Sequence, residues 1–299
     1  MKRDDDAALP PPNQATAADQ VAADLAAAAD QVHAAAVLSA NRIEKTYPNG
    51  TRALDEVRLA IERGEFVSLL GPSGCGKSTL LKMFAGLEEP SHGHLRWWGK
   101  NLATVGTPGH TLAMVFQEAT LMPWASVADN VRLPLDLRRM PRQQSTQRVD
   151  AALALVGLKR FHQAYPRELS GGMQMRASIA RALATQPNLL LMDEPFGALD
   201  EFTRNRLDAD LRAIWGRQDL TVVFVTHSIY EAVFLSSRVI VMAARPGRVI
   251  ADIAIDAPGP RDDAFRTSPA FLAYCKTLSD YLIQANQEGQ AHDTATQTI

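Results

Sequence analysis

The stretch Gly71-Pro-Ser-Gly-Cys-Gly-Lys-Ser-Thr79 decides the fold of this chain. It follows Glu65–Leu70, a short apolar run that predicts a buried strand, and precedes Leu80–Gly86, whose apolar residues have helical spacing. A glycine-rich turn between a strand and a helix is the setting in which the pattern G-x-x-x-x-G-K-[ST] binds phosphates. Backbone N–H groups and the positive end of the helix dipole would face the bound anion. We therefore expect a nucleoside triphosphate site here.

Single residues of this stretch have separate expected roles. Lys77 would reach the β- and γ-phosphates, and the hydroxyl of Ser78 would bind Mg²⁺. Because Cys75 lies near the N-terminus of a helix, which lowers a thiol pKa, we expect it to react with maleimide and to be protected by ATP. The whole loop is expected to contact the nucleotide: Gly71, Pro72, Ser73, Gly74, Cys75, Gly76, Lys77, Ser78 and Thr79.

Composition limits the class of protein. The chain has 299 residues, 46% of them hydrophobic, and a net charge of −2, which is typical of a globular protein and not of a nucleic-acid binder with a basic face. Two cysteines argue against a disulfide framework and fit a reducing cytoplasm. No apolar run approaches the roughly 18 residues of a membrane span, and Met1–Asp6 is acidic where a signal peptide would be apolar. A partner would therefore have to do any membrane work.

The two ends of the chain differ in composition from its centre. Residues 1–36 are rich in alanine and contain Pro10–Pro12; we expect a mobile leader without a role in catalysis, although a helix from about Thr16 is the alternative. Residues 37–257 are expected to form the main domain. In residues 258–299 we expect a helix from Ser268 to about Ile283 and then a frayed polar tail.

Helical patterns interrupt the strand–helix alternation in the middle of the chain. Ser126–Arg138 and Gln143–Val156 both predict helices, and Pro134 is expected to kink or end the first. We therefore expect a helical subdomain over about residues 118–185.

A second apolar strand carries the candidate hydrolytic residues. Asn188–Asp193 predicts a strand that ends in acid, and Glu194 follows it directly. Asp193 would hold Mg²⁺, and Glu194 would polarise a water molecule in line with the γ-phosphate. Alternatively, the Asp-Glu-Pro sequence only ends a strand.

Further motifs and their order along the chain make it resemble the ATP-binding subunit of an ABC transporter from about residue 38 to 285. Leu169-Ser-Gly-Gly-Met-Gln174 resembles the signature motif of that family. Gln117 resembles the glutamine of its Q-loop, Gly197–Asp200 its D-loop, and His227 its switch histidine. The resemblance implies an α/β fold: a P-loop NTPase core with a mixed sheet, an antiparallel β subdomain and a helical subdomain.

The resemblance also implies a mechanism. Glu194, His227, Gln117 and Lys77 would be catalytic, and Ser78, Gln117 and Asp193 would hold the Mg²⁺. A second copy of the chain would add Ser170, Gly171, Gly172 and Asp200 to the ATP site of the first. Two copies would pack head to tail around two ATP molecules, and hydrolysis would separate them.

Two positions leave questions open. Tyr47 corresponds to the adenine-stacking aromatic residue of the family, but a packed turn residue is the alternative. The signature motif usually continues as Gln-Gln-Arg or Gln-Gln-Lys, whereas this chain has Gln174-Met-Arg176. Because Met175 would lie inside a helix, we expect it to affect packing more than chemistry.

Three later stretches resemble nitrate, sulfonate and taurine importers: Glu118–Asn130, Thr226–Leu235 and Ala243–Arg248. The expected solute is thus a small anion, although importers of pyrimidine-type thiamine precursors show the same resemblance. The implied partners are two integral-membrane permease subunits and, indirectly, an extracytoplasmic solute-binding protein, with no nucleic acid. The implied location is peripheral, on the cytoplasmic face of the inner membrane.

Leu121-Met-Pro-Trp124 is the candidate contact with the permease. Trp124 is of the type that anchors interfaces, but packing inside the helical subdomain is the alternative. Two rival functions are the alternatives to transport. A non-transport ABC ATPase acting on ribosomes or DNA would usually have two cassettes or long coiled coils, and a plain P-loop kinase would lack the signature and switch elements.

Overall fold

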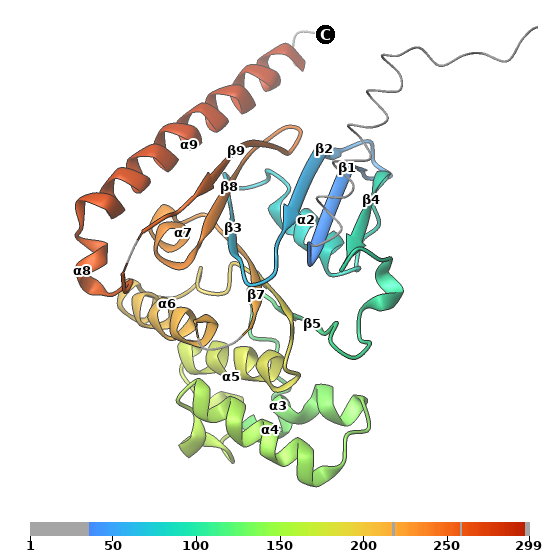
Figure 1. The fold of residues 1–299 in the computed structure, drawn as a ribbon, viewed down its shortest axis with the longest axis vertical. Coiled ribbons are helices and arrows are strands. Elements are labelled where there is room, and N and C mark those ends of the chain that lie inside the picture. Colours follow the sequence, from blue (N-terminus) through green and yellow to red (C-terminus); the bar gives the residue numbers. More distant parts are fainter. Residues whose placement is uncertain (1–35, 217–218, 258, 297–299) are drawn as a thin grey trace, which may run out of the picture.

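A computed structural model describes residues 36–216, 219–257 and 259–296 of the chain. Figure 1 shows three parts: a central sheet with helices, a small sheet beside it, and a helical lobe at one end. The predicted leader lies outside the described residues, apart from the buried Ala36. Within the described part, no helix is both long and apolar enough to cross a membrane.

The central sheet has six strands, of which only the edge strand β9 runs antiparallel to its neighbour. In sheet order the strands are β5 (Leu112–Val115), β6 (Leu189–Asp193), β7 (Thr221–Thr226), β3 (Phe66–Leu70), β8 (Arg238–Ala243) and β9 (Arg248–Ala254). The carboxyl ends of β3, β6 and β7 meet at one edge, where ligands bind in parallel sheets. The phosphate loop and the two predicted acids are therefore brought together although more than 100 residues separate them in the sequence.

Alternate residues of β3 point into two hydrophobic cores. Phe66 and Leu70 pack in the core that reaches the helical lobe, and Val67 and Leu69 pack in the core under the small sheet. All five residues of β3 are buried, which explains its continuous apolar sequence. The helices of this central part are α2 (Lys77–Phe84), α6 (Glu201–Trp215), α7 (Ile229–Leu235), α8 (Asp263–Arg266) and α9 (Pro269–Thr296).

The small sheet is antiparallel, as the resemblance implies. Its order is β2 (Arg52–Ile61), β1 (Leu38–Thr46) and β4 (His92–Trp97). It packs on α2, and the indole of Trp97 donates a 2.9 Å hydrogen bond to the carbonyl of Phe84 at the end of that helix. The small sheet is thus fixed to the element that follows the phosphate loop.

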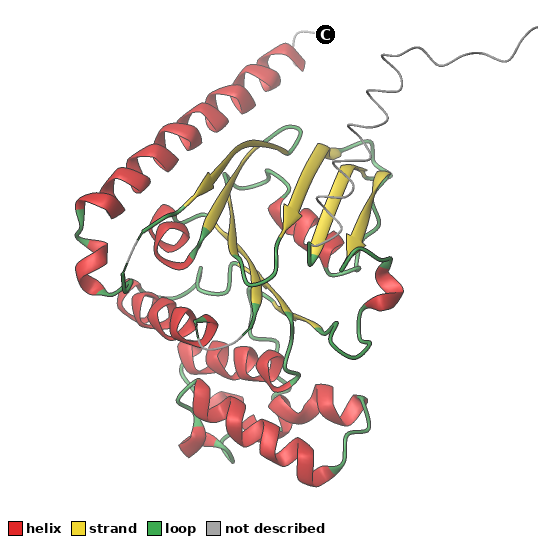
Figure 2. Cartoon of the chain, in the orientation of Figure 1, coloured by secondary structure: helices red, strands yellow, loops and turns green. Residues whose placement is uncertain are grey.

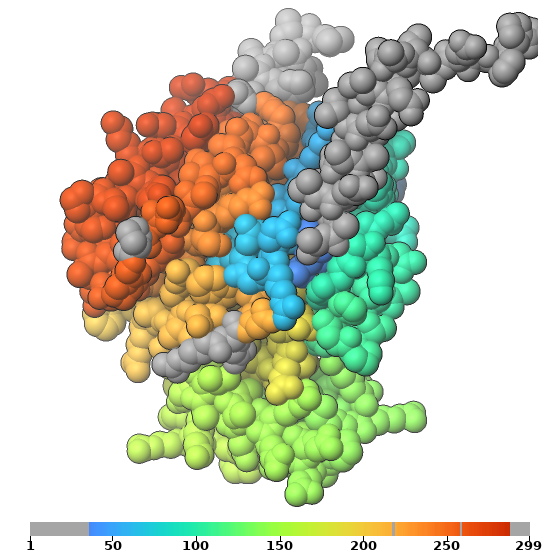
Figure 3. Space-filling model, in the orientation of Figure 1, coloured from blue at the N-terminus to red at the C-terminus, as the bar shows by residue number. Residues whose placement is uncertain are grey.

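The helical lobe consists of α3 (Val127–Leu137), α4 (Arg142–Leu155) and the start of α5 (Gly171–Ala184). It forms the lower end of the molecule in the space-filling view of Figure 3. Pro134 does not end α3, which continues to Leu137. The helix packs against α4 and α5, and this tertiary contact holds it beyond the proline.

The C-terminal helix is longer than expected, as Figure 2 shows. Phe271 and Leu278 are buried, and Tyr274 and Tyr281 pack against the same core, so the predicted apolar face is confirmed. Helix α9 continues past the predicted end near Ile283 and runs to Thr296. No proline interrupts residues 284–296, and glutamine and alanine there favour the helix.

Candidate functional site

The loop between β3 and α2 has a left-handed backbone at two glycines. Gly74 has φ 77° and Gly76 has φ 87°, values that other residues rarely adopt. A Cβ atom on Gly76 would also lie 2.6 Å from a methyl carbon of Leu54 and 2.8 Å from the carbonyl oxygen of Ala53. Only glycine at this position allows β2 to approach the loop and α2 to begin at Lys77.

A cleft of about 410 Å³ opens over this loop. Its lining includes most of the expected loop residues and Glu194, together with four residues that the sequence did not indicate. The lining residues are Thr51, Arg52, Ala53, Ser73, Gly74, Gly76, Lys77, Ser78, Thr79, Glu194 and Arg245. Thr51–Ala53 follow the Pro48-Asn-Gly50 turn, and Arg245 follows β8; neither carries a sequence signal for phosphate binding.

Lys77 is 4% exposed and lies under the loop. Its ammonium group donates hydrogen bonds of 2.9 and 3.0 Å to the carbonyl oxygens of Gly71 and Pro72, and lies 3.9 Å from Oε1 of Glu194. The charge is therefore held by the floor of the cleft and is directed toward the end of β6. A triphosphate in the cleft would compete with these oxygens for the same ammonium group.

Ser78 and Asp193 form the pair that could hold a metal ion. The hydroxyl of Ser78 donates a 2.9 Å hydrogen bond to Oδ1 of Asp193. Burial, followed by the neighbouring charge of Glu194, raises the pKa of Asp193. Two hard oxygen ligands side by side, with phosphate oxygens to complete the shell, fit Mg²⁺. No cluster of three or more histidine, cysteine or acidic residues that could hold a metal ion occurs in the described part of the chain.

Glu194 stands directly after β6 in a left-handed conformation with φ 43°. Its backbone N–H bonds to the carbonyl of Val225 on β7 at 3.0 Å, which fixes the turn. Its Oε2 lies 3.2 Å from Nδ1 of His227, a side chain that is 54% exposed. Backbone strain at a solvent-facing acid paired with a histidine is common at functional sites.

Gln117 and His227 converge on the D-loop glycine. A Cβ atom placed on Gly197 would lie 3.8 Å from Nε2 of Gln117 and 3.8 Å from Cε1 of His227. The N–H of Gly197 also donates a 3.1 Å hydrogen bond to the carbonyl of Glu194. Three separate segments of the chain, those of Gln117, His227 and the Glu194–Gly197 turn, thus meet at Gly197.

Tyr47 lies beside the phosphate loop. Its hydroxyl is 3.2 Å from Oγ1 of Thr79, and the ammonium group of Lys45 lies 5.3 Å from the centre of its ring. The residue is half-buried at the rim of the cleft, so both the packing role and the base-stacking role stay open to it.

The prediction that the helix N-terminus lowers the thiol pKa of Cys75 is wrong. The thiol is fully buried in the core under the small sheet, and burial raises its pKa, with the charge of Lys77 opposing this only in part. The N-terminus of α2 therefore does not make this thiol reactive. The side chain points away from the cleft, and only the backbone of Cys75 belongs to the phosphate loop.

The signature residues do not line the cleft of their own chain. Ser170 caps α5 by accepting from the N–H of Met173, and the amide of Gln174 donates to the carbonyls of Pro166 and Leu169. Asp200 likewise caps α6, and hydrogen bonds from the first turn of that helix, mainly from Thr203, lower its pKa. Both are exposed helix N-termini on the surface of the protein.

The two helix starts are in tight contact. A Cβ atom on Gly172 would lie 2.8 Å from the methyl carbon of Thr203, whereas one on Gly171 would meet its nearest neighbour, Leu199, at 3.8 Å. Further along, Arg176 donates 2.6 Å to Asp210 on α6 and 3.4 Å to the carbonyl of Val156 at the end of α4.

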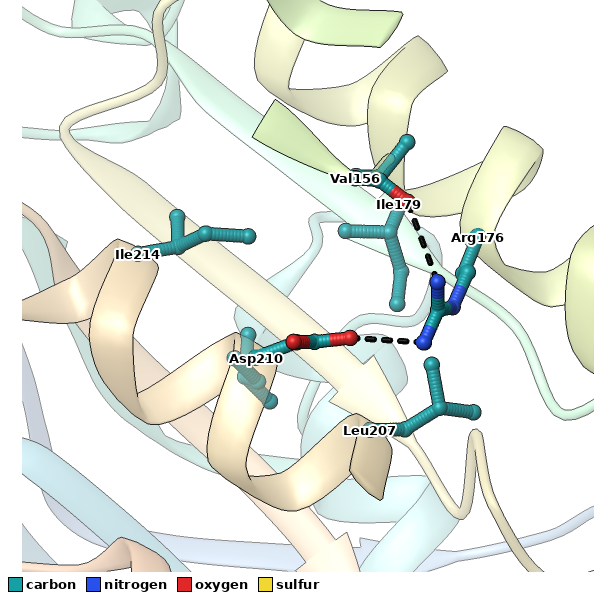
Figure 4. A pocket seen from close by; sticks show the side chains of 7 residues that line it. Val156, Arg176, Ile179, Leu207, Asp210 and Ile214 are labelled. Atoms are coloured by element: carbon teal, nitrogen blue, oxygen red, sulfur yellow. Dashed lines mark hydrogen bonds and ion pairs between the residues drawn. The ribbon is translucent and has the colours of Figure 1, made fainter. Parts of the chain in front are cut away.

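Figure 4 shows the guanidinium of Arg176 between Asp210 on α6 and Val156 at the end of α4. Met175, beside it in the sequence, is 4% exposed and packs in the core, as expected.

The comparisons with known proteins agree with the geometry. A family model described as ABC transporter matches residues 54–197. The aliphatic sulfonates import ATP-binding protein of Bacillus licheniformis is 44% identical over 76% of this chain and 87% of that protein. For the taurine import ATP-binding protein of Chromobacterium violaceum the identity is 41%, over 86% and 100% of the two chains. For the nitrate import ATP-binding protein of Synechocystis it is 42%, over 77% and 88%.

A solved structure shows the same fold. It is a dimeric structure of the ATP-binding cassette MJ0796 in a post-hydrolysis state, bound to ADP and phosphate. It matches with a TM-score of 0.65 and 33% sequence identity, over 74% of this chain and 99% of that one.

We predict that Gly172→Ala destabilises the fold by about 1 kcal/mol. The contact with Thr203 costs about 1–3 kcal/mol, and the better helix propensity of alanine returns up to about 1 kcal/mol. Gly171→Ala is the matched control, because it has the same propensity gain without a clash. Urea unfolding of the three proteins measures the difference, and adding Thr203→Ser to Gly172→Ala should restore most of the loss. Equal stability of the two alanine variants would contradict the contact.

Proposed function

This chain belongs to the ABC transporter family, and from its site we propose that it is the ATP-hydrolysing subunit of a membrane importer. The observation that carries the proposal is the convergence of Lys77, the Ser78–Asp193 pair and the Glu194–His227 pair on one cleft. The groups proposed to bind phosphate, to hold the metal ion and to accept the proton thus lie side by side at this cleft.

ATP binding would use the floor of the cleft. The backbone N–H groups of the loop and the ammonium group of Lys77 would bind the β- and γ-phosphates. Ser78 and Asp193 would hold Mg²⁺, which neutralises negative charge on the phosphate oxygens when bound. Thr79 and Tyr47 stand at the rim, where Tyr47 would contact the base.

Hydrolysis would use the pair at the end of β6. The carboxylate of Glu194 would accept a proton from the attacking water as the water approaches the γ-phosphorus. The imidazole of His227 would hold this carboxylate and the reacting phosphate in position, and the amide of Gln117 would contact the metal, the water and the γ-phosphate. Their convergence around Gly197 supports these roles.

Each site would be completed by a second copy of the chain. Ser170 and Gly171 are exposed at the start of α5, with Gly172 buried behind them, and all three lie outside the cleft of their own chain. This helix start is thus available to bind a γ-phosphate held by another copy. Asp200 stands at a second exposed helix start, beside them. The dimeric arrangement of the related cassette MJ0796 supports this assembly. In a head-to-tail pair, ATP would join the two copies and hydrolysis would release them.

The segment after Gln117 is the proposed contact with the membrane subunits. Trp124 is 76% exposed, so the alternative of packing inside the lobe is wrong. The surrounding loop is nevertheless rigid. Asn130, which is fully buried, bonds to Met122, Ala125 and Ser126, and Arg181 bonds to the carbonyls of Ala119 and Thr120. An exposed aromatic residue on a fixed loop is typical of an interface anchor.

The proposed partners follow from this contact. Two integral-membrane permease subunits would bind the loop from the membrane side, which places the chain at the cytoplasmic face of the inner membrane. A solute-binding protein would act on the outer side of the permease. The three related importer subunits act on aliphatic sulfonates, taurine and nitrate, and we propose a small anionic solute of this class.

We predict that Lys77→Ala and Glu194→Gln affect different steps. Lys77→Ala removes the charge that compensates the phosphates, so the affinity for ATP should fall by about tenfold or more. Glu194→Gln should bind ATP normally and lose roughly 10²- to 10⁴-fold in turnover, leaving a stable ATP-bound dimer in size-exclusion chromatography. Lys100→Ala, an exposed lysine away from the cleft, is the control. Wild-type turnover by Glu194→Gln would refute the assignment.

We also predict that Met122→Ala and Trp124→Ala keep the fold and the basal ATPase activity of the isolated subunit. Assembly with the permease should fail, because the exposed anchor is lost. Uptake of radiolabelled taurine, a sulfonate and nitrate by cells carrying each variant measures transport, and co-purification measures assembly. Leu87→Ala removes another exposed apolar side chain and serves as the control. Normal uptake, or unfolding of the isolated variants, would contradict the proposed contact.

A further inference from the structure

Arg204 has no part in the mechanism above, yet it joins the D-loop to α7, the helix that follows His227. It lies in the first turn of α6, directly after the D-loop. Its guanidinium group donates a 2.8 Å hydrogen bond to the carbonyl of Leu199 in the D-loop, and its Nε forms an ion pair with Oε1 of Glu231 on α7 at 3.4 Å. The Arg204 side chain is 26% exposed and that of Glu231 is 7% exposed, so solvent screens this pair only in part.

Glu231 continues the connection toward His227. Its second carboxylate oxygen accepts a hydrogen bond from the hydroxyl of Thr226, the residue before His227. The same hydroxyl oxygen accepts a 2.9 Å bond from the N–H of Ser228, the residue after His227. The residues on both sides of the histidine are therefore bound to one buried network.

The network ends at the catalytic pair. Nδ1 of His227 lies 3.2 Å from Oε2 of Glu194, as described above. A continuous series of contacts thus runs from the D-loop carbonyl through Arg204, Glu231 and Thr226 to the histidine beside the candidate base. The links are the hydrogen bonds at Leu199 and Thr226, the Arg204–Glu231 ion pair and the peptide bond between Thr226 and His227, so a displacement of the D-loop is passed toward the histidine.

Arg204 also favours the charged form of Glu231, together with the hydrogen bond from Thr226 and the charge of His227. Burial raises the pKa of Glu231, and the charge of Arg204 lowers it. Asp208, one turn along α6, is fully buried; burial and the charge of Glu231 raise its pKa to about 7, although Arg266 donates to it at 3.1 Å. Without Arg204 the carboxyl group of Glu231 would lose its ion pair in a buried and acidic setting, and protonation would weaken its bond to Thr226.

We propose that Arg204 is a positioning residue that couples the D-loop to His227, so that contact of the D-loop with a second copy of the chain sets the histidine against Glu194. The inference rests on the proposed function, because it requires ATP hydrolysis in a dimer. It assigns a role to a side chain that touches neither nucleotide nor metal. The bridge makes turnover depend on the presence of the partner.

The test is steady-state ATP hydrolysis by the full chain with Arg204→Gln. We expect kcat to fall roughly tenfold, while KM and the affinity for a fluorescent ATP analogue stay within about twofold, since the cleft is untouched. Arg206→Gln, which changes an exposed arginine two residues along the same helix, should have no effect. Arg204→Lys should recover part of the loss, because an ammonium group can meet Leu199 or Glu231 but cannot span both as the guanidinium does.

A double-mutant cycle tests whether the coupling passes through Glu231. If it does, Arg204→Gln combined with Glu231→Gln should be no slower than the slower single variant. Multiplied losses, or wild-type kcat in Arg204→Gln, would overturn the inference, and so would equal changes in kcat, KM and the unfolding midpoint. If Arg204→Gln does not fold, Arg204→Lys and Glu231→Gln decide the question on the same readouts. A wild-type chain without ATPase activity would refute the proposed function as well.

Discussion

The left-handed turn through Gly74 and Gly76 is the constraint on which the rest of the structure depends. It lets β2 lie against the phosphate loop and makes α2 begin at Lys77, because Gly76 has no Cβ atom to meet Leu54 and the carbonyl of Ala53. Because α2 begins there, Ser78 meets Asp193 at the end of β6, and Lys77 lies under the loop within reach of Glu194. The start of one helix thus sets the proposed phosphate-binding cation Lys77 and the proposed metal ligand Ser78 against the two acids at the end of β6.

Local patterns predicted the parts of this site that follow from main-chain geometry. The glycine loop and the acidic end of β6 are recognisable because each needs particular residues beside a particular element. The approach of Arg245 and Thr51–Ala53 to the cleft was not predictable, since it depends on how the small sheet packs against the central one. The prediction of a reactive thiol at Cys75 was wrong for a similar reason. Its position before a helix suggested an activated thiol, but the core behind the loop buries the side chain.

Buried charge is concentrated in the layer behind the site. Asp208 and Glu231 are acids with pKa values raised by burial, and three arginines from two elements, Arg204 and Arg212 on α6 and Arg266 on α8, lie in the same region. Isolated charges of this kind are costly, so each is held by an ion pair or by backbone carbonyls. Such networks have few alternative arrangements of similar energy. In the proposed coupling, this layer would transmit displacement between α6 and α7.

The side chain of Asn130 forms its hydrogen bonds with main-chain atoms of residues 122, 125 and 126. These bonds hold the loop that carries Trp124 whichever side chain stands at position 124. Substitution of Trp124 after gene duplication would therefore leave the fold and the distant proposed catalytic groups undisturbed. A loop held in this way can bind a new partner after substitution at its tip alone. Related subunits within one cell can thus form separate assemblies.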